Sequence, residues 1–214
     1  MKRVFCSAMM IIAIAPLGAA AQQTQMPKPG QCRFSGFSRD TDPKGLNVRA
    51  KPSASSKIVA VLPPILLAPK GQGGGLRSGS RAPDFDVVEA KNGWFRIQNV
   101  TTYQLDAQTG DWEFVKNDRI KGWISGKYLD FVIQSEIGFE HPNPSSRRVW
   151  QEQDISQPFK NFDQNRVLDC QGGWAKIEWR ESQRLKRGWF RGICGVQETT
   201  CDGALGDYLG SASQ

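Results

Sequence analysis

The chain has 214 residues, with 28 Lys or Arg, 21 Asp or Glu and a single His, so its net charge at pH 7 is +7. This length allows one medium domain or two small ones. The positive charge is modest and its basic residues are scattered along the chain, which argues against a nucleic-acid-binding protein.

Residues 1–21 have the pattern of a secretory signal peptide. Two basic residues precede an apolar stretch that ends in small residues, and Ala19 and Ala21 supply the A-x-A pattern of a cleavage site. The apolar run is too short to span a membrane, and Cys6 leaves with it. We therefore expect a periplasmic or secreted protein, cleaved after about Ala21, with no transmembrane segment.

Four cysteines remain after cleavage, namely Cys32, Cys170, Cys194 and Cys201. An even number of cysteines in an exported chain predicts two disulfides, and four cysteines allow three pairings that the sequence does not resolve. The pairing that we favour joins Cys194 to Cys201, because they lie close together in the sequence. By elimination it joins Cys32 to Cys170, which would tie the N-terminus to the second half of the chain.

The first predicted structural elements are a leader and a pair of strands. Residues 22–39 are expected to form a flexible leader, because the first part of this segment is polar and contains two prolines. Apolar residues then alternate at Leu46 and Val48, the pattern breaks at Pro52, and apolar residues resume over residues 58–62. This pattern predicts a strand, a turn and a second strand.

Residues 68–81 are rich in Gly and Ser, and we expect them to form a loop. They lack the Lys-Ser/Thr ending of a phosphate-binding loop. Two alternating apolar runs then flank Asn92-Gly93, which is a strong signal for a β-hairpin turn. A second hairpin, long and polar, is predicted over residues 99–121 with its tip near Gly110.

The last part of the first half bends at Gly126, and one short helical turn is possible over residues 125–128. No stretch after the signal peptide sustains helical periodicity over three turns. We therefore predict an all-β protein, with a tail at residues 202–214 beyond its last element.

Two segments of the chain are repeated. The motif Pro-x-x-Ser-Ser-basic-x-Val occurs at 52–59 and again at 142–149, and the segment at 87–97 aligns without a gap with the one at 167–177. The spacing between the two copies shortens only where loops intervene. Since loops tolerate deletion while paired strands keep their register, this indicates duplication of one small β unit. The four Gly-Trp pairs of these units are interpreted mainly as core anchors.

The segments GLNVRAKPSASSKIVAVLP, NGWFRI and GWISGKYL, in this order, resemble the three consecutive signatures of the bacterial SH3-like domain. This resemblance covers residues 40–134 and implies a small five-stranded antiparallel barrel, common in exported cell-envelope proteins. Residues 138–201 resemble a degenerate second copy, with GFEH in place of LNVR and no Tyr-Leu pair at its end. Together they imply two tandem SH3-like barrels.

Three aromatic residues in the polar hairpin, Tyr103, Trp112 and Phe114, are candidates for contact with a ligand, because a role in the core is less necessary there. Packing of the hairpin on the barrel is the alternative. By resemblance to the family, Asn47, Arg49 and Tyr128 occupy strand ends that border a groove.

Arg49 can pair with a carboxylate of a bound peptide. The alternative is that Arg49 forms a salt bridge within its own domain.

The sequence contains few residues that could carry out catalysis or bind a metal ion. The one histidine, His141, lies between Glu140 and Pro142 in an expected turn, and a Cys-His pair would need a cysteine that stays reduced outside the cytoplasm. The sequence contains no CxxC or HExxH spacing. We therefore expect no catalytic residues, no metal and no cofactor.

Binding is the function that these observations favour. The sequence predicts a non-enzymatic exported protein that binds cell-envelope material, with peptidoglycan peptide or an envelope protein as its partner. The alternative is a periplasmic protein-protein adaptor or structural module, and a remote alternative is a cysteine hydrolase.

Overall fold

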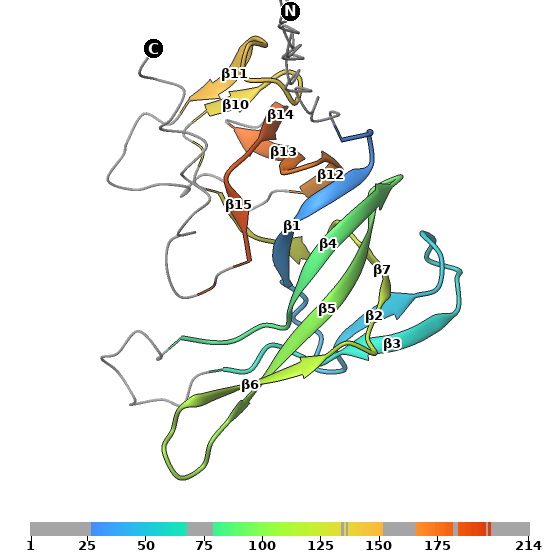
Figure 1. Ribbon diagram of the computed structural model, residues 1–214, viewed down its shortest axis with the longest axis vertical. Helices are drawn as coiled ribbons and strands as arrows, with labels where there is room; N and C mark the ends of the chain where they lie inside the picture. The colour runs from blue at the N-terminus through green and yellow to red at the C-terminus, as the bar shows by residue number, and fades with distance from the viewer. Residues whose placement is uncertain are drawn as a thin grey trace, which may run out of the picture.

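The computed structural model describes residues 27–67, 79–133, 135, 137–151, 166–181, 184–195 and 197. The expected signal peptide, the tail at residues 202–214 and most of the Gly- and Ser-rich loop lie outside the described residues. The described part of the chain contains strands and turns but no helix, so the all-β prediction is confirmed. Most of its strands form two antiparallel sheets, one from each half of the chain (Figure 1).

The first sheet comes from the N-terminal half of the chain. Its strands lie in the order β3-β2-β7-β5-β4-β1-β8, and β6 pairs with the second half of the long strand β5. The strands are β1 (Gln31–Ser38), β2 (Leu46–Arg49), β3 (Ile58–Leu62), β4 (Asp84–Lys91), β5 (Trp94–Leu105), β6 (Trp112–Asn117), β7 (Gly122–Ser125) and β8 (Leu129–Asp130).

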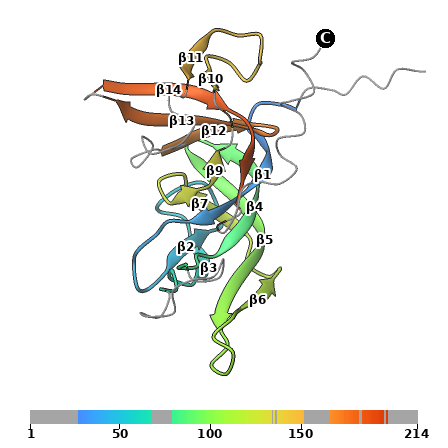
Figure 2. The same cartoon turned by 90° about the vertical axis from the view of Figure 1, so that its left-hand side faces the viewer.

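The second sheet lies across one end of the first, as Figure 2 shows for β12, β13 and β14. Its strands lie in the order β11-β10-β14-β13-β12, and a separate two-stranded sheet pairs β9 with β15. The strands are β9 (Val132–Ile133), β10 (Ile137–Phe139), β11 (Arg148–Gln151), β12 (Arg166–Gln171), β13 (Trp174–Glu181), β14 (Arg184–Phe190) and β15 (Ile193–Cys194).

Both predicted hairpins of the first half are present. Asn92 and Gly93 join β4 to β5 with φ of 53° and 76°, the pair of positive values that a tight two-residue hairpin turn requires. Gly110, with φ of 71°, lies in the turn between β5 and β6. At residues 125–128 the chain makes one turn, closed by a hydrogen bond from the Tyr128 amide to the Ser125 carbonyl at 2.9 Å.

The two sheets repeat one strand order, since β3-β2-β7-β5-β4 corresponds to β11-β10-β14-β13-β12. The register is repeated as well. Trp123 on β7 lies opposite Arg96 on β5, and Trp189 on β14 lies opposite Lys176 on β13, at the matching positions of the two copies. The register shift that follows Val87 in β4 also recurs in β12. The internal repeat seen in the sequence is therefore a repeat of strand order and pairing.

The Pro-x-x-Ser-Ser motif forms the same turn in both halves. The Lys51 amide donates to the Ser56 hydroxyl at 2.9 Å, and the His141 amide donates to the Ser146 hydroxyl at 3.2 Å. In each turn the first serine of the pair donates its amide N–H to the side chain two residues earlier. In both turns the hydroxyl of the second serine thus accepts a backbone amide hydrogen bond that no paired strand satisfies there.

Residues 31–38 form β1 and not part of a flexible leader, so that prediction was wrong for these residues. Phe34, Gly36 and Ser38 alternate as the buried positions of β1, which pairs with β4 on one side and β8 on the other. Two of these three buried residues are small, so the strand has a weak apolar signal in the sequence. Tertiary pairing provides the stabilisation that this short pattern lacks.

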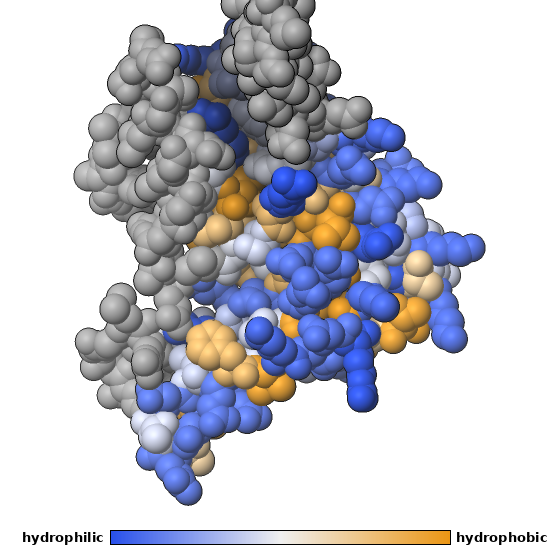
Figure 3. Space-filling view, in the orientation of Figure 1, coloured by the Kyte–Doolittle hydropathy of each residue, from blue (hydrophilic) through white to orange (hydrophobic). Residues whose placement is uncertain are grey.

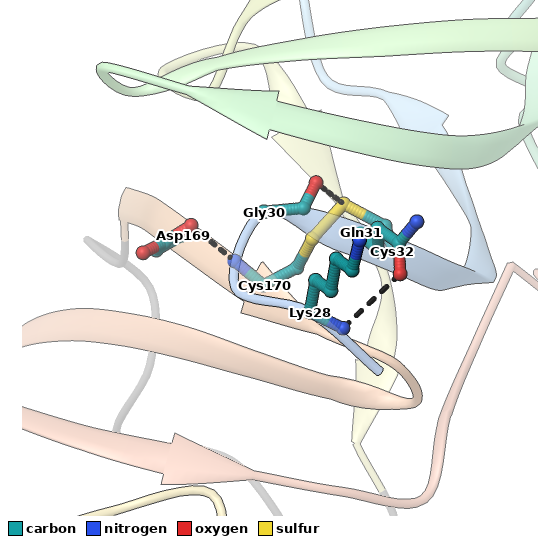
Figure 4. The surroundings of a disulfide bond; sticks show 6 residues. All are labelled: Lys28, Gly30, Gln31, Cys32, Asp169 and Cys170. Atoms are coloured by element: carbon teal, nitrogen blue, oxygen red, sulfur yellow. Dashed lines mark hydrogen bonds between the residues drawn. A yellow bond between two sulfur atoms is a disulfide. The ribbon is translucent and has the colours of Figure 1, made fainter. Parts of the chain in front are cut away.

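β1 also joins the two halves of the chain. Its Cys32 forms a disulfide with Cys170 on β12, with an S–S distance of 1.97 Å and a Cα–Cα distance of 5.3 Å (Figure 4). The Gly30 amide donates to the Cys170 carbonyl at 2.9 Å, and the Ala90 amide donates to the Gly30 carbonyl at 2.8 Å. Ala90 and Cys170 are equivalent positions of the repeat, so Gly30 bridges the two copies at matching points.

The favoured pairing of Cys32 with Cys170 is thus confirmed. Cys194 is also disulfide-bonded, and its expected partner Cys201 lies outside the described residues.

The two halves share one hydrophobic core. Its buried side chains include equivalent positions of the two copies, among them Val87, Phe95, Ile97 and Ile124 in the first half and Val167, Ala175, Ile177 and Phe190 in the second. Of the Gly-Trp tryptophans, Trp123 and Trp189 are buried but lie outside this cluster, whereas Trp94 and Trp174 are only half-buried. The half-buried pair lies at the ends of the sheets, where ligand sites can form.

Candidate ligand-binding site

A groove of about 840 Å³ lies at one end of the first sheet, and we call it the Trp94 groove. Three of the six predicted ligand contacts, Asn47, Arg49 and Tyr128, line it. The groove therefore brings together residues from both ends of the first unit. Its full lining consists of Arg39, Asp40, Thr41, Asp42, Gly45, Leu46, Asn47, Arg49, Ala54, Trp94, Ser125, Lys127 and Tyr128.

Strand alternation on β2 explains how two of these residues reach the groove. Leu46 and Val48 are buried in the core, so Asn47 and Arg49 project from the opposite face of the strand. Trp94 begins β5 directly after the hairpin turn and lies opposite Ser125 of β7. Its half-buried position places an indole ring against the groove without closing it.

Two turns that are far apart in sequence form one wall of the groove. The Arg39 guanidinium donates through Nε to the Lys127 carbonyl at 2.7 Å, and the Arg39 amide donates to the Tyr128 carbonyl at 3.0 Å. The Lys127 ammonium lies over the Tyr128 ring, 5.1 Å from its centroid. These contacts hold this wall of the groove together.

The groove contains both signs of charge. The Asp40 carboxylate accepts a hydrogen bond from the Asp42 amide at 3.2 Å, and the Asp42 carboxylate accepts one from the Lys44 amide at 2.9 Å. These two bonds stabilise the turn that carries both carboxylates. Arg49 donates through Nη1 to the Ser56 carbonyl at 2.7 Å. Its intradomain partner is thus a backbone carbonyl and not the salt bridge considered above. A held guanidinium beside a groove is suited to a carboxylate ligand.

Tyr103 and Phe114 lie elsewhere, in a separate pocket of about 360 Å³ that we call the Tyr103 pocket. They face one another across β5 and β6, with ring centroids 5.4 Å apart. The six predicted contacts therefore do not form one site.

Trp112 does not provide the exposed ring that was expected. Only 7% of its surface is exposed, and the Arg81 guanidinium lies 5.7 Å from the centroid of its ring. Arg81, at the end of the Gly- and Ser-rich segment, is itself buried and exchanges two backbone hydrogen bonds of 2.8 Å with Leu66. The prediction failed because the sequence does not show that Arg81 lies against the Trp112 ring.

In the second unit, two side chains lie against the tryptophan equivalent to Trp94. Phe139 occupies the position of Arg49 and packs edge-on against Trp174, with centroids 5.6 Å apart. The Arg191 guanidinium lies over the same Trp174 ring at 5.6 Å. The half-buried tryptophans of the two units thus share a register but not their surroundings, since described side chains cover Trp174 whereas Trp94 lines a groove.

The residues considered for chemistry lie apart from both cavities. Cys32, Cys170 and Cys194 are disulfide-bonded, and a cysteine in a disulfide has no thiolate. His141 is exposed in its turn. Within the described ranges, no group of three or more His, Cys, Asp or Glu side chains is placed to hold a metal ion.

Sequence reasoning missed Trp94, Arg39 and Lys127 as groove residues. The Gly-Trp pattern alone predicts a core position for Trp94, because it does not distinguish the four pairs. Its position directly after the Asn-Gly turn was a usable signal, since a residue at a strand end is covered on fewer sides than one in the middle of a strand.

Comparison of the chain with protein-family models, with curated proteins and with solved structures finds no match. Among the described residues, no helix has the length and apolar character needed to cross a membrane.

Proposed function

We propose that this protein is an exported, non-enzymatic binding protein of two tandem SH3-like units, and that its Trp94 groove binds extended peptide of the cell envelope. Peptidoglycan peptide is the preferred ligand, and no cofactor takes part. The observation that carries the proposal is the convergence of Asn47, Arg49 and Tyr128 with Trp94 on one open groove. The strand order shared by the two sheets supports two related units, and the disulfide supports an oxidising compartment.

The chemistry of the groove is suited to a peptide that carries charge. The indole of Trp94 and the phenol ring of Tyr128 offer flat faces to the apolar parts of an extended chain. Asn47 is exposed and has an amide that can both donate to and accept from a peptide backbone. Arg49 would pair with a carboxylate, while Asp40 and Asp42 would attract a ligand amine.

We predict that the protein binds purified sacculi through the Trp94 groove. The wild-type protein should co-sediment with them, and Arg49→Gln should weaken binding by roughly 10-fold, the usual loss for a charge-assisted hydrogen bond. Lys116→Gln is the matched control, because it removes the same charge from an exposed residue of β6 outside the groove.

Co-sedimentation at several protein concentrations measures both variants. Absence of wild-type binding, or equal weakening by the two substitutions, would contradict a specific groove.

A second candidate function, a protein-protein adaptor, is favoured by strand β3. This strand ends the first sheet, and Ile58, Val59 and Val61 on it are 44 to 49% exposed. Exposed apolar side chains on an edge strand can pair with a strand of another protein. If Val59→Lys abolishes capture of an envelope protein while sacculus binding is absent, the adaptor function replaces the first proposal.

A further inference from the structure

The Tyr103 pocket has a lining unlike that of the Trp94 groove. It lies between β4, β5, β6 and residues that follow β15. The residues of its lining that matter here are Asp84, Asp86, Asn99, Tyr103, Phe114 and Gln197. Two carboxylates and two aromatic rings face the same cavity, and none of the described residues that line it is Lys, Arg or His. On a chain with net charge +7, this is a local negative site.

The two carboxylates are held by neutral donors. Tyr103 donates its hydroxyl hydrogen to Asp84 Oδ2, and the Asn99 amide donates to Asp86 Oδ2 at 2.7 Å. Neither carboxylate forms an ion pair with a described residue. Their negative charge is therefore oriented but not neutralised, and an incoming cation would find both in place.

A β-bulge positions one of these donors. Between the pairs Asp84–Thr101 and Asp86–Gln98, β5 has one residue more than β4, and Asn99 there adopts a positive φ of 51°. Bulges redirect side chains and are common beside functional sites. On β13 the buried positions Ala175, Ile177 and Trp179 alternate without interruption, so the described part of the second unit has no bulge residue that corresponds to Asn99.

The rings of Tyr103 and Phe114 provide an apolar wall beside the two carboxylates. Phe114 is 66% exposed, although its ring lies 5.4 Å from that of Tyr103 at a tilt of 56°. Figure 3 shows apolar side chains over the β5–β6 region, surrounded by hydrophilic ones. On the other side, the Gly195 amide donates to the Ser35 hydroxyl at 2.8 Å, which fixes the remaining wall.

We propose that the Tyr103 pocket binds a primary ammonium group on an alkyl chain, such as a lysine side chain or a free alkylamine. The methylenes would lie along Tyr103 and Phe114, and the ammonium would donate hydrogen bonds to Asp86 and Asp84. A quaternary ammonium has no N–H to donate to the carboxylates. Ca²⁺ and Mg²⁺ sites are usually built around several carboxylates, and among the described residues no group of three or more His, Cys, Asp or Glu side chains is placed to hold a metal ion.

The test is a titration of the full chain followed through the aromatic NMR signals of Tyr103 and Phe114. The probes are Nα-acetyl-lysine-methylamide, its uncharged analogue Nα-acetyl-norleucine-methylamide, butylammonium and tetramethylammonium. We expect saturable shifts with the lysine derivative and with butylammonium, and none with the other two. Tighter binding of the lysine derivative indicates a peptide side chain as the natural source, and equal binding indicates a free amine.

Two variants and two matched controls assign the site. Asp86→Asn keeps an acceptor for the Asn99 amide, so the pocket should remain intact while binding weakens at least about 10-fold. Phe114→Ala should weaken it roughly 3-fold. Asp118→Asn removes the same charge and Leu185→Ala a similarly exposed apolar side chain, both outside the pocket, and both should bind as the wild type does.

Equal binding of the norleucine or tetramethylammonium probe would overturn the proposal, as would unchanged affinity of Asp86→Asn or shifts centred on Trp94. The result is independent of the Trp94 groove, because Arg49→Gln leaves every residue of the Tyr103 pocket unchanged. Failure here and failure of sacculus binding are therefore distinguishable.

Discussion

At the scale of single residues, burial sets the behaviour of Asp130. This carboxyl lies on β8 beside the core, and burial raises its pKa above the ordinary value of 3.8. A hydrogen bond of 2.9 Å from the Phe131 amide and the charge of Arg39 act in the opposite direction but do not outweigh burial. Folding therefore disfavours the ionised form of Asp130 relative to its protonated form.

We predict a pH dependence of stability that Asp130→Asn removes. Because the folded state binds this proton more tightly, protonated Asp130 favours folding, and that contribution is lost as pH rises from about 3.8 through the raised pKa. Relative to the wild type, Asp130→Asn should thus gain in free energy of unfolding as pH rises across this interval. Urea unfolding at several pH values measures it, and a difference that does not vary with pH would contradict the assignment.

At the same scale, Trp94 and Trp174 occupy equivalent positions of the two units but have different surroundings. Both begin the second strand of a hairpin after a glycine. Phe139 and Arg191 cover Trp174, whereas the residue equivalent to Phe139 in the first unit is Arg49, which is held away by the Ser56 carbonyl. Two differences between the copies, Phe139 in place of Arg49 and Arg191 in place of Ser125, thus give the two rings different surroundings.

At the scale of elements, the approach of β2 and β3 depends on one glycine. Gly45 precedes β2 with φ of 79°, and a Cβ there would lie 2.0 Å from the Leu62 carbonyl oxygen. The oxygen belongs to the backbone of β3 and cannot move aside without disturbing the strand pairing. Gly93 also has a positive φ, 76°, but a Cβ there would meet only the end of the Arg166 side chain at 3.5 Å.

We therefore predict unequal effects of alanine at two glycines of similar φ. Gly93→Ala should cost about 1 kcal/mol of free energy of unfolding, from the left-handed conformation alone. Gly45→Ala should cost about 3 kcal/mol or more, because overlap with the backbone adds to that strain. Denaturant unfolding compares the two, and equal losses would mean that the turn before β2 relaxes without cost.

At the scale of the whole molecule, β1 and its disulfide join two copies of one unit. The Cys32–Cys170 bond spans a sequence separation of 138 residues. The buried side chains of both halves form one cluster, so the units are expected to unfold together.

Removal of this disulfide should destabilise the whole molecule. We predict that the double variant Cys32→Ala and Cys170→Ala loses about 2–5 kcal/mol, because a long loop in the unfolded chain is no longer closed. Alanine is tolerated sterically at Cys170, since the equivalent residue of the first unit is Ala90, also buried. Thermal and denaturant unfolding measure the loss, and a change confined to the second unit would show that the units are independent.

Much of the fold was determined locally and could be predicted from the sequence. Apolar alternation, the Asn92-Gly93 turn and the Pro-x-x-Ser-Ser motif depend on residues within a few positions of one another, so they predicted the strands and hairpins that are observed. Comparison of the chain with itself also predicted the repeat, since strands that keep one register keep one pattern.

Only the tertiary structure decided which residues share a cavity and which are covered. β1, with few apolar residues, is a strand because β4, β8 and the second unit pair with it. Trp112 is buried with Arg81 against its ring, and Asn47, Arg49 and Tyr128 lie with Trp94 while Tyr103 and Phe114 lie apart. These facts depend on contacts between residues far apart in the chain, and such contacts leave no pattern in the local sequence.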